Sequence, residues 1–355
     1  MKNVVTFGEI LLRLTPPGYE KFVQTERLCA SFGGSETNVA VSLAQLGLKS
    51  EFVTRLPENP IAEMAINSIA RYGVGTSKIV RGGDRVGLYY YENTPSMRES
   101  KVVYDRAESS FATSGAGYYD WEKIFRRTDD PSKTVDWFHW SGIGPSLSQE
   151  AADATLAAVR TARRMGITVS SDLNYRKNLW RYGKTSYEIM PDIAKECDVL
   201  FGTEGEYEKT FGIKPLTDFT MKSDKEELDI EPHREFCEKV MKVAEKCKLM
   251  FVALRNVVDA SHHVFIGLLM TREGEMLQSK TYMIDPVVDC VGCGDAFAAG
   301  MIYGINKYPN DNRQALEAAT AAAVLKNTMR GDFNLSTAEE VENLKGGDTS
   351  GRISR

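Results

Sequence analysis

The chain has 355 residues, 42% hydrophobic and 26% charged, which is an ordinary composition for a globular enzyme. Its 44 Lys and Arg against 49 Asp and Glu give a formal net charge of −5, which argues against a nucleic-acid partner because phosphate backbones require clustered cations. Six dispersed cysteines, no signal-peptide pattern and no apolar run near the roughly 18 residues of a membrane span predict a reduced, cytoplasmic protein with no membrane partner.

The N-terminal part predicts both sheet and lid elements. Hydrophobic periodicity predicts a strand at residues 4–14, interrupted by Gly8-Glu9, and then a helix, a strand and a helix at residues 37–46, 51–54 and 61–72. Residues 87–92 and 101–106 follow as two short strands with no helix between them, which favours an antiparallel pair. We interpret this pair as part of a lid rather than of the main sheet.

From residue 135 onward, strands and helices alternate. The expected strands are 135–140, 167–171, 198–201 and 249–254, and the expected helices are 149–165, 186–196, 204–211 and 234–246. A hairpin of strands 264–270 and 280–284 and two closing helices, 295–306 and 312–327, complete the pattern. This alternation predicts an α/β fold with a mostly parallel sheet covered on both faces. We expect one domain over residues 1–345 and a polar tail at 346–355.

The most informative stretch is Asp289-Cys-Val-Gly-Cys-Gly-Asp295, which leads into a helix. Gly292 and Gly294 allow backbone N–H groups to turn inward and form an anion-binding loop, to which the helix adds its positive end. Asp295, just past the glycines, could accept a proton from a substrate hydroxyl, and phosphoryl transfer needs such a base beside bound phosphate. A plain helix start capped by Asp295 is the alternative. The sequence contains neither a Walker motif nor the dinucleotide-binding fingerprint that an NAD-dependent oxidoreductase would carry.

This stretch resembles the C-terminal signature of the ribokinase-like (PfkB) carbohydrate kinases, usually Asp-Thr-x-Gly-Ala-Gly-Asp. Gly33-Gly-Ser-Glu-Thr-Asn-Val-Ala40 is similar to the N-terminal signature of that family. The resemblance covers nearly the whole chain. Several segments look most like 2-keto-3-deoxygluconate kinases, namely Phe7–Leu14, Gly87–Tyr89, Val103–Arg106, Ser171–Arg176 and Gly331–Phe333.

The resemblance implies a ribokinase-like fold, with a Rossmann-like core and a small β-sheet lid drawn from about residues 10–35 and 85–110. It implies phosphorylation of a sugar-acid primary hydroxyl by ATP with Mg²⁺, and leaves a monovalent cation requirement open. A homodimer through the lid is common among such kinases. The implied product is 2-keto-3-deoxygluconate 6-phosphate.

The resemblance also implies roles for individual residues. Asp295 would be the general base and Gly292, Cys293 and Gly294 the phosphate loop. Substrate contacts would come from two N-terminal residues, Gly34 and Asn38, from the lid, and from Arg176. The expected lid contacts are Tyr89, Tyr104 and Arg106. Arg106 and Arg176 match positions that hold the substrate carboxylate, for which the planar guanidinium is suited. Solvated arginines and tyrosines that only pack the sheet are the ordinary alternatives.

Thr203 and Glu206 match the family's Asn-x-x-Glu motif, with Thr in place of Asn. Glu206 would act on Mg²⁺ through water and Thr203 near the nucleotide, although the pair also reads as a helix capping box. Arg255 would lie near the ATP phosphates. Cys293 replaces the usual Ala and forms a Cys-x-x-Cys with Cys290, for which a zinc site or a redox role is a minor alternative. His262 and His263 are expected in a surface loop.

Two other functions remain open from the sequence. A kinase for a neutral sugar such as fructose, or for a nucleoside, would keep Asp295 but would not need the two arginines. A non-catalytic sugar-acid or nucleotide sensor would keep the fold without turnover, since fold alone does not fix function.

Overall fold

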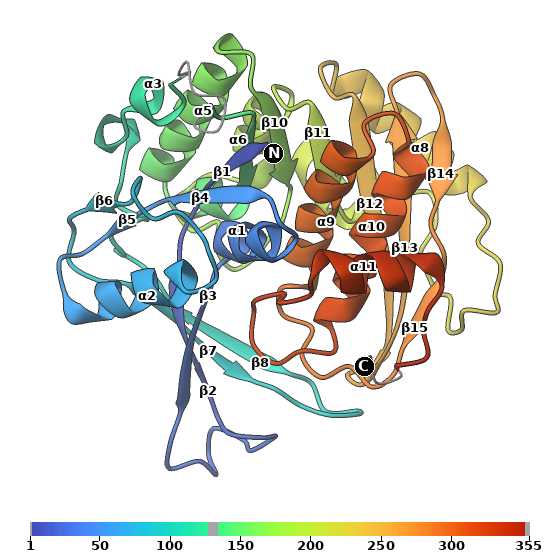
Figure 1. Ribbon diagram of the computed structural model, residues 1–355, viewed down its shortest axis with the longest axis horizontal. Coiled ribbons are helices and arrows are strands. Elements are labelled where there is room, and N and C mark those ends of the chain that lie inside the picture. Colours follow the sequence, from blue (N-terminus) through green and yellow to red (C-terminus); the bar gives the residue numbers. More distant parts are fainter. Residues whose placement is uncertain (1, 127–133, 352–355) are drawn as a thin grey trace.

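The computed structural model describes residues 2–126 and 134–351. Residues 352–355 of the expected polar tail, and residues 1 and 127–133 of the expected domain, lie outside the described residues. The α/β fold class predicted from the sequence is confirmed, with helices on both faces of a mostly parallel sheet and a separate small sheet (Figure 1). Within the part of the chain described here, no helix is long and apolar enough to cross a bilayer.

The main sheet has the strand order β14-β13-β12-β11-β10-β9-β1-β4, and β15 pairs with β13. The strands from β4 to β12 in this order are parallel, whereas β13, β14 and β15 are antiparallel additions. Their bounds are β1 Asn3–Phe7, β4 Lys49–Val53, β9 Trp137–Ser141, β10 Thr168–Asp172, β11 Val199–Gly202, β12 Leu249–Asp259, β13 His262–Thr271, β14 Met276–Gln278 and β15 Tyr282–Ile284. Because neighbouring parallel strands end at the same edge, Asp172 and Gly202 come close together there.

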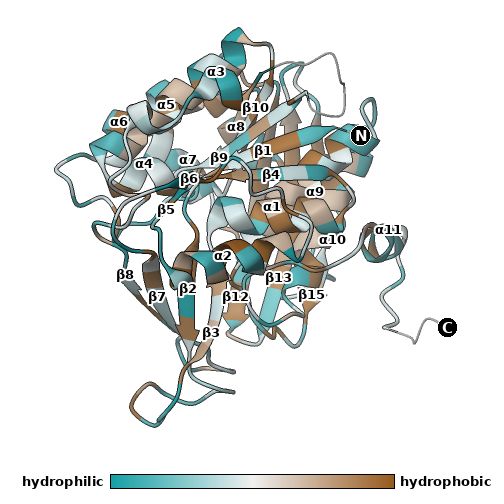
Figure 2. Cartoon of the chain, turned by 60° about the vertical axis from the view of Figure 1, so that its left-hand side comes forward, coloured by the Kyte–Doolittle hydropathy of each residue, from teal (hydrophilic) through white to brown (hydrophobic). Residues whose placement is uncertain are grey.

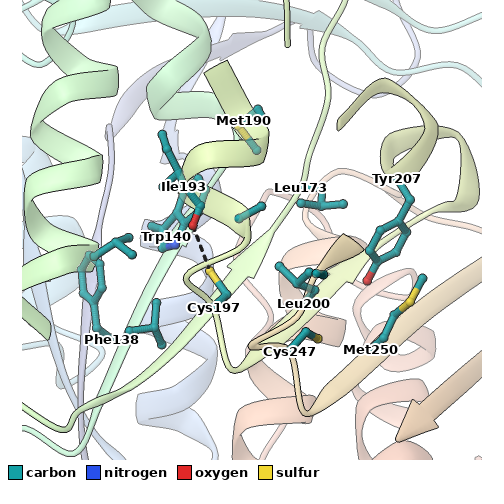
Figure 3. Packing of buried hydrophobic residues seen from close by; sticks show 14 of the residues in the cluster. Phe138, Trp140, Leu173, Met190, Ile193, Cys197, Leu200, Tyr207, Cys247 and Met250 are labelled. Atoms are coloured by element: carbon teal, nitrogen blue, oxygen red, sulfur yellow. Dashed lines mark hydrogen bonds between the residues drawn. The ribbon is translucent and has the colours of Figure 1, made fainter. Parts of the chain in front are cut away.

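Helices cover both faces of this sheet through two apolar clusters (Figure 2). The first face carries α3 Trp121–Ile124, α5 Gln149–Arg164, α6 Ser186–Ala194, α7 Glu204–Phe211 and α8 Glu231–Val243. The second carries α1 Ser35–Gln45, α9 Cys293–Lys307, α10 Asn312–Lys326 and α11 Ala338–Gly346. Figure 3 shows side chains of the first cluster, among them Leu173 just after β10, Leu200 on β11 and Met250 on β12. All six cysteines are free thiols.

A separate four-stranded sheet, which we call the lid, extends away from the core (Figure 1). Its order is β3-β2-β7-β8, with bounds β2 Leu11–Thr15, β3 Cys29–Gly33, β7 Gly87–Glu92 and β8 Lys101–Asp105. The expected antiparallel pairing of β7 and β8 is confirmed. Helix α2, Pro60–Ala70, packs at the base of the lid in a third apolar cluster. Short elements complete the chain: β5 Arg55–Leu56, β6 Val80–Arg81, the 3-10 turn η1 Ala116–Tyr118 and α4 Ile143–Leu147.

Two local predictions need correction. The pairing predicted for strands 264–270 and 280–284 is confirmed, since β13 and β15 are antiparallel partners, but β14 comes between them in the chain, so they do not form a direct hairpin. A direct hairpin is formed instead by β12 and β13, because β12 extends to Asp259 and turns back. The two histidines expected in a surface loop start β13, where His263 is buried and His262 contacts Asp259 and Asp285.

The prediction of only two closing helices is also incomplete, because α11 follows them. This helix begins with a capping box in which Thr337 accepts from the backbone N–H of Glu340 and the Glu340 carboxylate accepts from that of Thr337. The Thr-x-x-Glu pattern was the sequence signal that could have located this helix.

Candidate active site

A cavity of about 460 Å³ lies between the lid and the carboxyl ends of β10 and β11. Its lining brings together every site residue expected from the sequence, namely Gly34, Asn38, Tyr89, Tyr104, Arg106, Arg176, Thr203, Glu206, Arg255, Gly292, Cys293, Gly294 and Asp295. A groove of about 1210 Å³ between α2 and residues 330–335 is larger, and its lining, as far as the chain is described, includes none of them. The smaller cavity is therefore the candidate active site, because the chemistry lies there.

The anion loop is built on one left-handed glycine. Gly292 caps α9 with φ 85°, and a Cβ at this position would lie 2.1 Å from the carbonyl oxygen of Asp332. Only glycine fits this backbone without strain and without a clash. The loop therefore presents the N-terminal end of α9 to the cavity, as anion binding requires.

Asp295 lies in the first turn of α9 and is buried. Its Oδ1 accepts a hydrogen bond from Ser35 Oγ at 2.7 Å, and its Oδ2 accepts one from Asn38 Nδ2 at 2.7 Å. Burial raises the pKa of the Asp295 carboxyl above its ordinary value, although the hydrogen bonds from Asn38 and Ser35 lower it in part. A carboxylate whose pKa is raised in this way is a stronger base.

Gly34 and Asn38 fix the orientation of the hydrogen bond from Asn38 to Asp295. Gly34 has φ 153°, and a Cβ there would lie 2.0 Å from the carbonyl oxygen of Glu9. The Asn38 Oδ1 accepts from the backbone N–H of Gly34 at 3.2 Å, which turns Nδ2 toward Asp295. The hydrogen bond from Asn38 to Asp295 thus joins two residues that are 257 positions apart in the chain.

The Arg106 guanidinium is already paired with a carboxylate of the protein, that of Glu9. Its Nε donates to Glu9 Oε2 at 2.8 Å and its Nη2 contacts the same oxygen, in a pair where both side chains are almost fully buried. Ser109 Oγ donates to the other oxygen of Glu9. The Glu9 carboxylate therefore neutralises Arg106, and only part of the guanidinium is available to a substrate anion.

The two lid tyrosines lie differently. Tyr89 is buried and its hydroxyl donates to the Asp332 carboxylate at 2.6 Å, so its ring lines the cavity while its hydroxyl is used inside the protein. Tyr104 is 37% exposed, with its ring 6.2 Å from that of Tyr89. Tyr104 is therefore the lid tyrosine with a surface free to meet a ligand.

Arg176 and Glu206 lie beside each other in the cavity lining. The Arg176 side chain is 48% exposed, and its Nη1 lies 3.8 Å from Glu206 Oε1. Thr203 and Glu206 form the capping box of α7, in which Glu206 Oε2 accepts from the backbone N–H of Thr203 at 2.7 Å. Thr203 and Glu206 therefore form the helix capping box that the sequence offered as an alternative. This use of Oε2 leaves Glu206 Oε1 for the contact with Arg176.

Asp172, at the end of β10, is a cavity carboxylate that the sequence reasoning did not single out. Asn174 donates to it from its backbone N–H at 3.1 Å and from Nδ2 at 3.3 Å. Burial, with the nearby charges of Glu206 and Asp295, raises the pKa of Asp172. Its place at a parallel strand end was the available signal, because ligands bind beyond the carboxyl ends of such strands.

The donor set fits a hard cation. Glu206 and Asp172 supply oxygen atoms, which Mg²⁺ prefers, and Mg²⁺ commonly keeps several of its waters. In the described ranges, no group of three or more His, Cys, Asp or Glu side chains could hold a metal ion directly. The residues therefore suit a metal that is held mainly through water and phosphate oxygens.

Cys290 and Cys293 flank the turn of the anion loop. The backbone N–H of Cys293 donates to the carbonyl of Cys290 at 3.3 Å, and Arg255 Nη1 lies 3.4 Å from Cys293 Sγ. Burial raises the pKa of the Cys290 thiol, which slows its oxidation. A disulfide between them would pull Gly292 out of its constrained position against Asp332.

We therefore expect oxidation of wild-type protein by diamide, which takes up the two electrons and two protons of the dithiol, to abolish most of the phosphotransfer that the sequence predicts. Dithiothreitol should restore it, and Cys290→Ser should resist the treatment. ADP release measures the activity and mass spectrometry verifies the disulfide. Full activity in a sample with a verified Cys290–Cys293 bond would contradict this expectation.

A buried ionic network links the lid to the anion loop. Arg13, on β2, donates to Asp332 Oδ1 through Nη1 and to Asp289 Oδ2 through Nη2, each at 2.7 Å. Gly331 N–H also donates to Asp289 Oδ2, at 3.1 Å. The sequence reasoning missed Arg13 and Asp332, because nothing local marks two charges 319 positions apart as partners.

Comparison with known proteins places these features in context. A model of the pfkB family of carbohydrate kinases matches residues 1–252. A 2-dehydro-3-deoxygalactonokinase of Haloferax volcanii is 30% identical over 98% of both chains. The crystal structure of 2-dehydro-3-deoxygluconokinase from Thermotoga maritima superposes with a TM-score of 0.88 at 37% identity, covering 98% of this chain and 100% of that one. A fructokinase with bound ATP from Xylella fastidiosa shares the fold, with a TM-score of 0.72 at 20% identity and coverage of 97% and 98%.

Proposed function

The chain belongs to the pfkB family of carbohydrate kinases, and from this we propose that it transfers the terminal phosphate of ATP to the primary hydroxyl of a sugar acid, 2-keto-3-deoxygluconate. The observation that carries this proposal is the position of Asp295. A buried carboxylate with a raised pKa stands beside the anion loop, in a cavity that also holds the half-exposed Arg176. A base, an anion site and a carboxylate-binding cation are the groups that the reaction needs.

Each of these residues has a separate role in the proposed phosphoryl transfer. The backbone N–H groups around Gly292–Gly294 bind the oxygens of the transferring phosphate. Asp295 takes the proton of the primary hydroxyl as that oxygen forms its bond to phosphorus, and the bond from phosphorus to ADP breaks. Asn38 and Ser35 hold the Asp295 carboxylate in line. Tyr104 and the lid strands cover the cavity and exclude water, which limits hydrolysis of ATP.

Glu206 and Asp172 would hold Mg²⁺ through its water shell, with Thr203 keeping Glu206 in place through the capping box. The ion would neutralise negative charge on the nucleotide phosphates. Arg255, which is exposed at the cavity rim and contacts Cys293, would add a positive charge near the same phosphates.

The substrate carboxylate is assigned mainly to Arg176. Arg106 is held by Glu9, so its contribution is limited to the part of the guanidinium that Glu9 leaves open. Arg176 Nη1 donates to the carbonyl of Tyr175 at 3.4 Å and lies 3.8 Å from Glu206 Oε1. Almost half of the Arg176 side chain is exposed, so it can form a charge-assisted hydrogen bond with the substrate acid.

Replacement Arg176→Ala is expected to raise KM for 2-keto-3-deoxygluconate by about 10- to 100-fold, because a hydrogen bond to a charged group contributes about 1.5–3 kcal/mol. KM for ATP should change little. Arg181→Ala, an exposed arginine of the same segment that does not line the cavity, is the matched control. Unchanged KM in Arg176→Ala would remove the carboxylate role from this residue.

The pairing of Arg106 with Glu9 favours one competing function, a kinase for a neutral sugar such as fructose, because the site then needs less positive charge. The test is ADP release with Mg-ATP and 2-keto-3-deoxygluconate, its galactonate epimer, fructose, ribose or adenosine. Turnover on the keto-deoxy acids alone supports the proposal. Turnover on a neutral sugar alone keeps Asp295 as base but discards the Arg176 assignment. No turnover favours the sensor alternative.

A further inference from the structure

Lys326 is a lysine without any exposed surface. It ends α10, and its Nζ donates to two backbone carbonyl oxygens, that of Asp289 at 3.0 Å and that of Met329 at 3.1 Å. Its Cε lies 3.4 Å from the point where a Cβ of Gly292 would stand. The ammonium group therefore lies against the anion loop, and the described residues that line the cavity do not include Lys326.

The two carbonyls belong to the two segments that define the loop. Asp289 opens the anion loop itself. Met329 opens the segment that returns to it, from which Gly331 N–H donates to Asp289 and the Asp332 carbonyl backs Gly292. Holding the carbonyls of Asp289 and Met329 on one cation therefore fixes the distance between these segments, and with it the direction of the loop N–H groups.

Burying an ammonium costs several kcal/mol unless it is compensated. Burial lowers the pKa of Lys326 below its ordinary value, and the nearby carboxylates of Asp289 and Asp332 offset this only in part. Arg13 bonds both carboxylates, so Lys326 brings the buried group of two cations and two anions to a net charge of zero. Lysine rather than an apolar residue at this position is thus accounted for by its charge and its carbonyl contacts.

Carbonyl oxygens that converge on a cation are the ligands by which proteins bind K⁺. We propose that the Lys326 ammonium is the resident cation of the anion loop, a positioning residue that replaces a monovalent ion from solution. This rests on the proposed phosphotransfer at the same loop. The enzyme should accordingly need no K⁺, Na⁺ or NH₄⁺ for full activity.

The first measurement is ADP release by the wild-type enzyme in tetramethylammonium buffers, with and without added KCl or NaCl at constant ionic strength. Equal kcat and equal KM for ATP are expected. A requirement of the wild-type enzyme for either ion would overturn the proposal, whatever the variants do.

The second measurement uses Lys326→Met, which removes the charge but keeps the stem against Gly292. We expect kcat to fall by about 10- to 100-fold, since a misplacement of about 1 Å at reacting groups costs this much, and the affinity for ATP to fall with it. K⁺ or NH₄⁺ should restore part of both, while tetramethylammonium, which is too large, should not. A variant that is folded yet fully active, or inactive with every cation, would overturn the proposal. Lys239→Met, a surface lysine of α8 paired with Glu235, is the matched control.

Circular dichroism verifies folding, and Lys326→Gln replaces the Met variant if the latter does not fold. Calorimetric titration with ATP gives a readout that does not need turnover. If the wild-type enzyme releases no ADP with any sugar, the proposed function fails. The affinity of Lys326→Met for ATP with and without K⁺ would then still decide the role of Lys326.

Discussion

Replacement Asp295→Asn is expected to lower kcat by about 10²–10⁴-fold, the contribution typical of a general base. The amide is nearly the same size and can still accept from Asn38 or Ser35, so the cavity should keep its shape. It cannot take the proton of the attacking hydroxyl. The affinity for ATP should remain close to that of the wild-type enzyme, which calorimetric titration measures alongside ADP release.

The thermal stability of Asp295→Asn distinguishes a loss of catalysis from a loss of folded protein. Burial raises the pKa of Asp295 in the folded state, so the ionised carboxylate opposes folding once the pH exceeds that pKa, and its contribution is more favourable at low pH. At neutral pH Asp295→Asn should therefore unfold at the same or a higher temperature. Asp311→Asn, at the N-cap of α10, is the control. A loss of kcat smaller than about tenfold would exclude Asp295 as the general base, given the usual size of this effect.

Replacement Arg13→Met is expected to lower the free energy of unfolding by about 3–5 kcal/mol, because it leaves two buried carboxylates without their cation. Arg13 bonds both Asp289 and Asp332 at 2.7 Å, and its guanidinium lies 4.5 Å from the ring centre of Tyr91. The variant should also lose activity, since it disconnects β2 of the lid from the anion loop. Urea unfolding measures the first effect and ADP release the second.

Arg27→Met, an exposed arginine of the lid region, controls for loss of a surface charge and should change the stability by less than about 0.5 kcal/mol. The double variant Arg13→Met with Asp332→Asn removes one of the stranded charges and should recover part of the stability lost by Arg13→Met. If the double variant is less stable than the wild type by the sum of the two single effects, the two side chains are not energetically coupled, and the network does not stabilise the protein in this way.

Patterns that are local in the sequence predicted their elements well. Helix α7 has the predicted bounds, because its capping box at Thr203 and Glu206 and the left-handed Gly212 at its end mark both termini. The glycine motifs near residues 34 and 292 likewise placed Asn38 and Asp295 at one site. Such signals are carried by residues only a few positions apart, so they can be read before the fold is known.

Contacts between distant segments could not be read in the same way. Arg106 carried the expected residue type for a carboxylate site, but its partner Glu9 stands 97 positions away and takes up most of its guanidinium. In the sequence, Lys326 is an ordinary lysine at the end of a predicted helix. Only the fold shows that its ammonium group donates to two backbone carbonyls. β12 was predicted too short because its outer half, Arg255–Asp259, is largely polar and becomes a strand through pairing with β13.

The bond between Arg13 and Asp332 also bears on the order in which a growing chain becomes active. Synthesis proceeds from the N-terminus, so Arg13 has left the ribosome long before residue 332 of 355 is added. A chain that stops at residue 330 would contain Asp295 and both glycine motifs, yet Gly292 would lack its backing and Arg13 one of its two carboxylates. The segment that contains Asp332 thus completes the site last, and we expect fragments that end before it not to consume ATP.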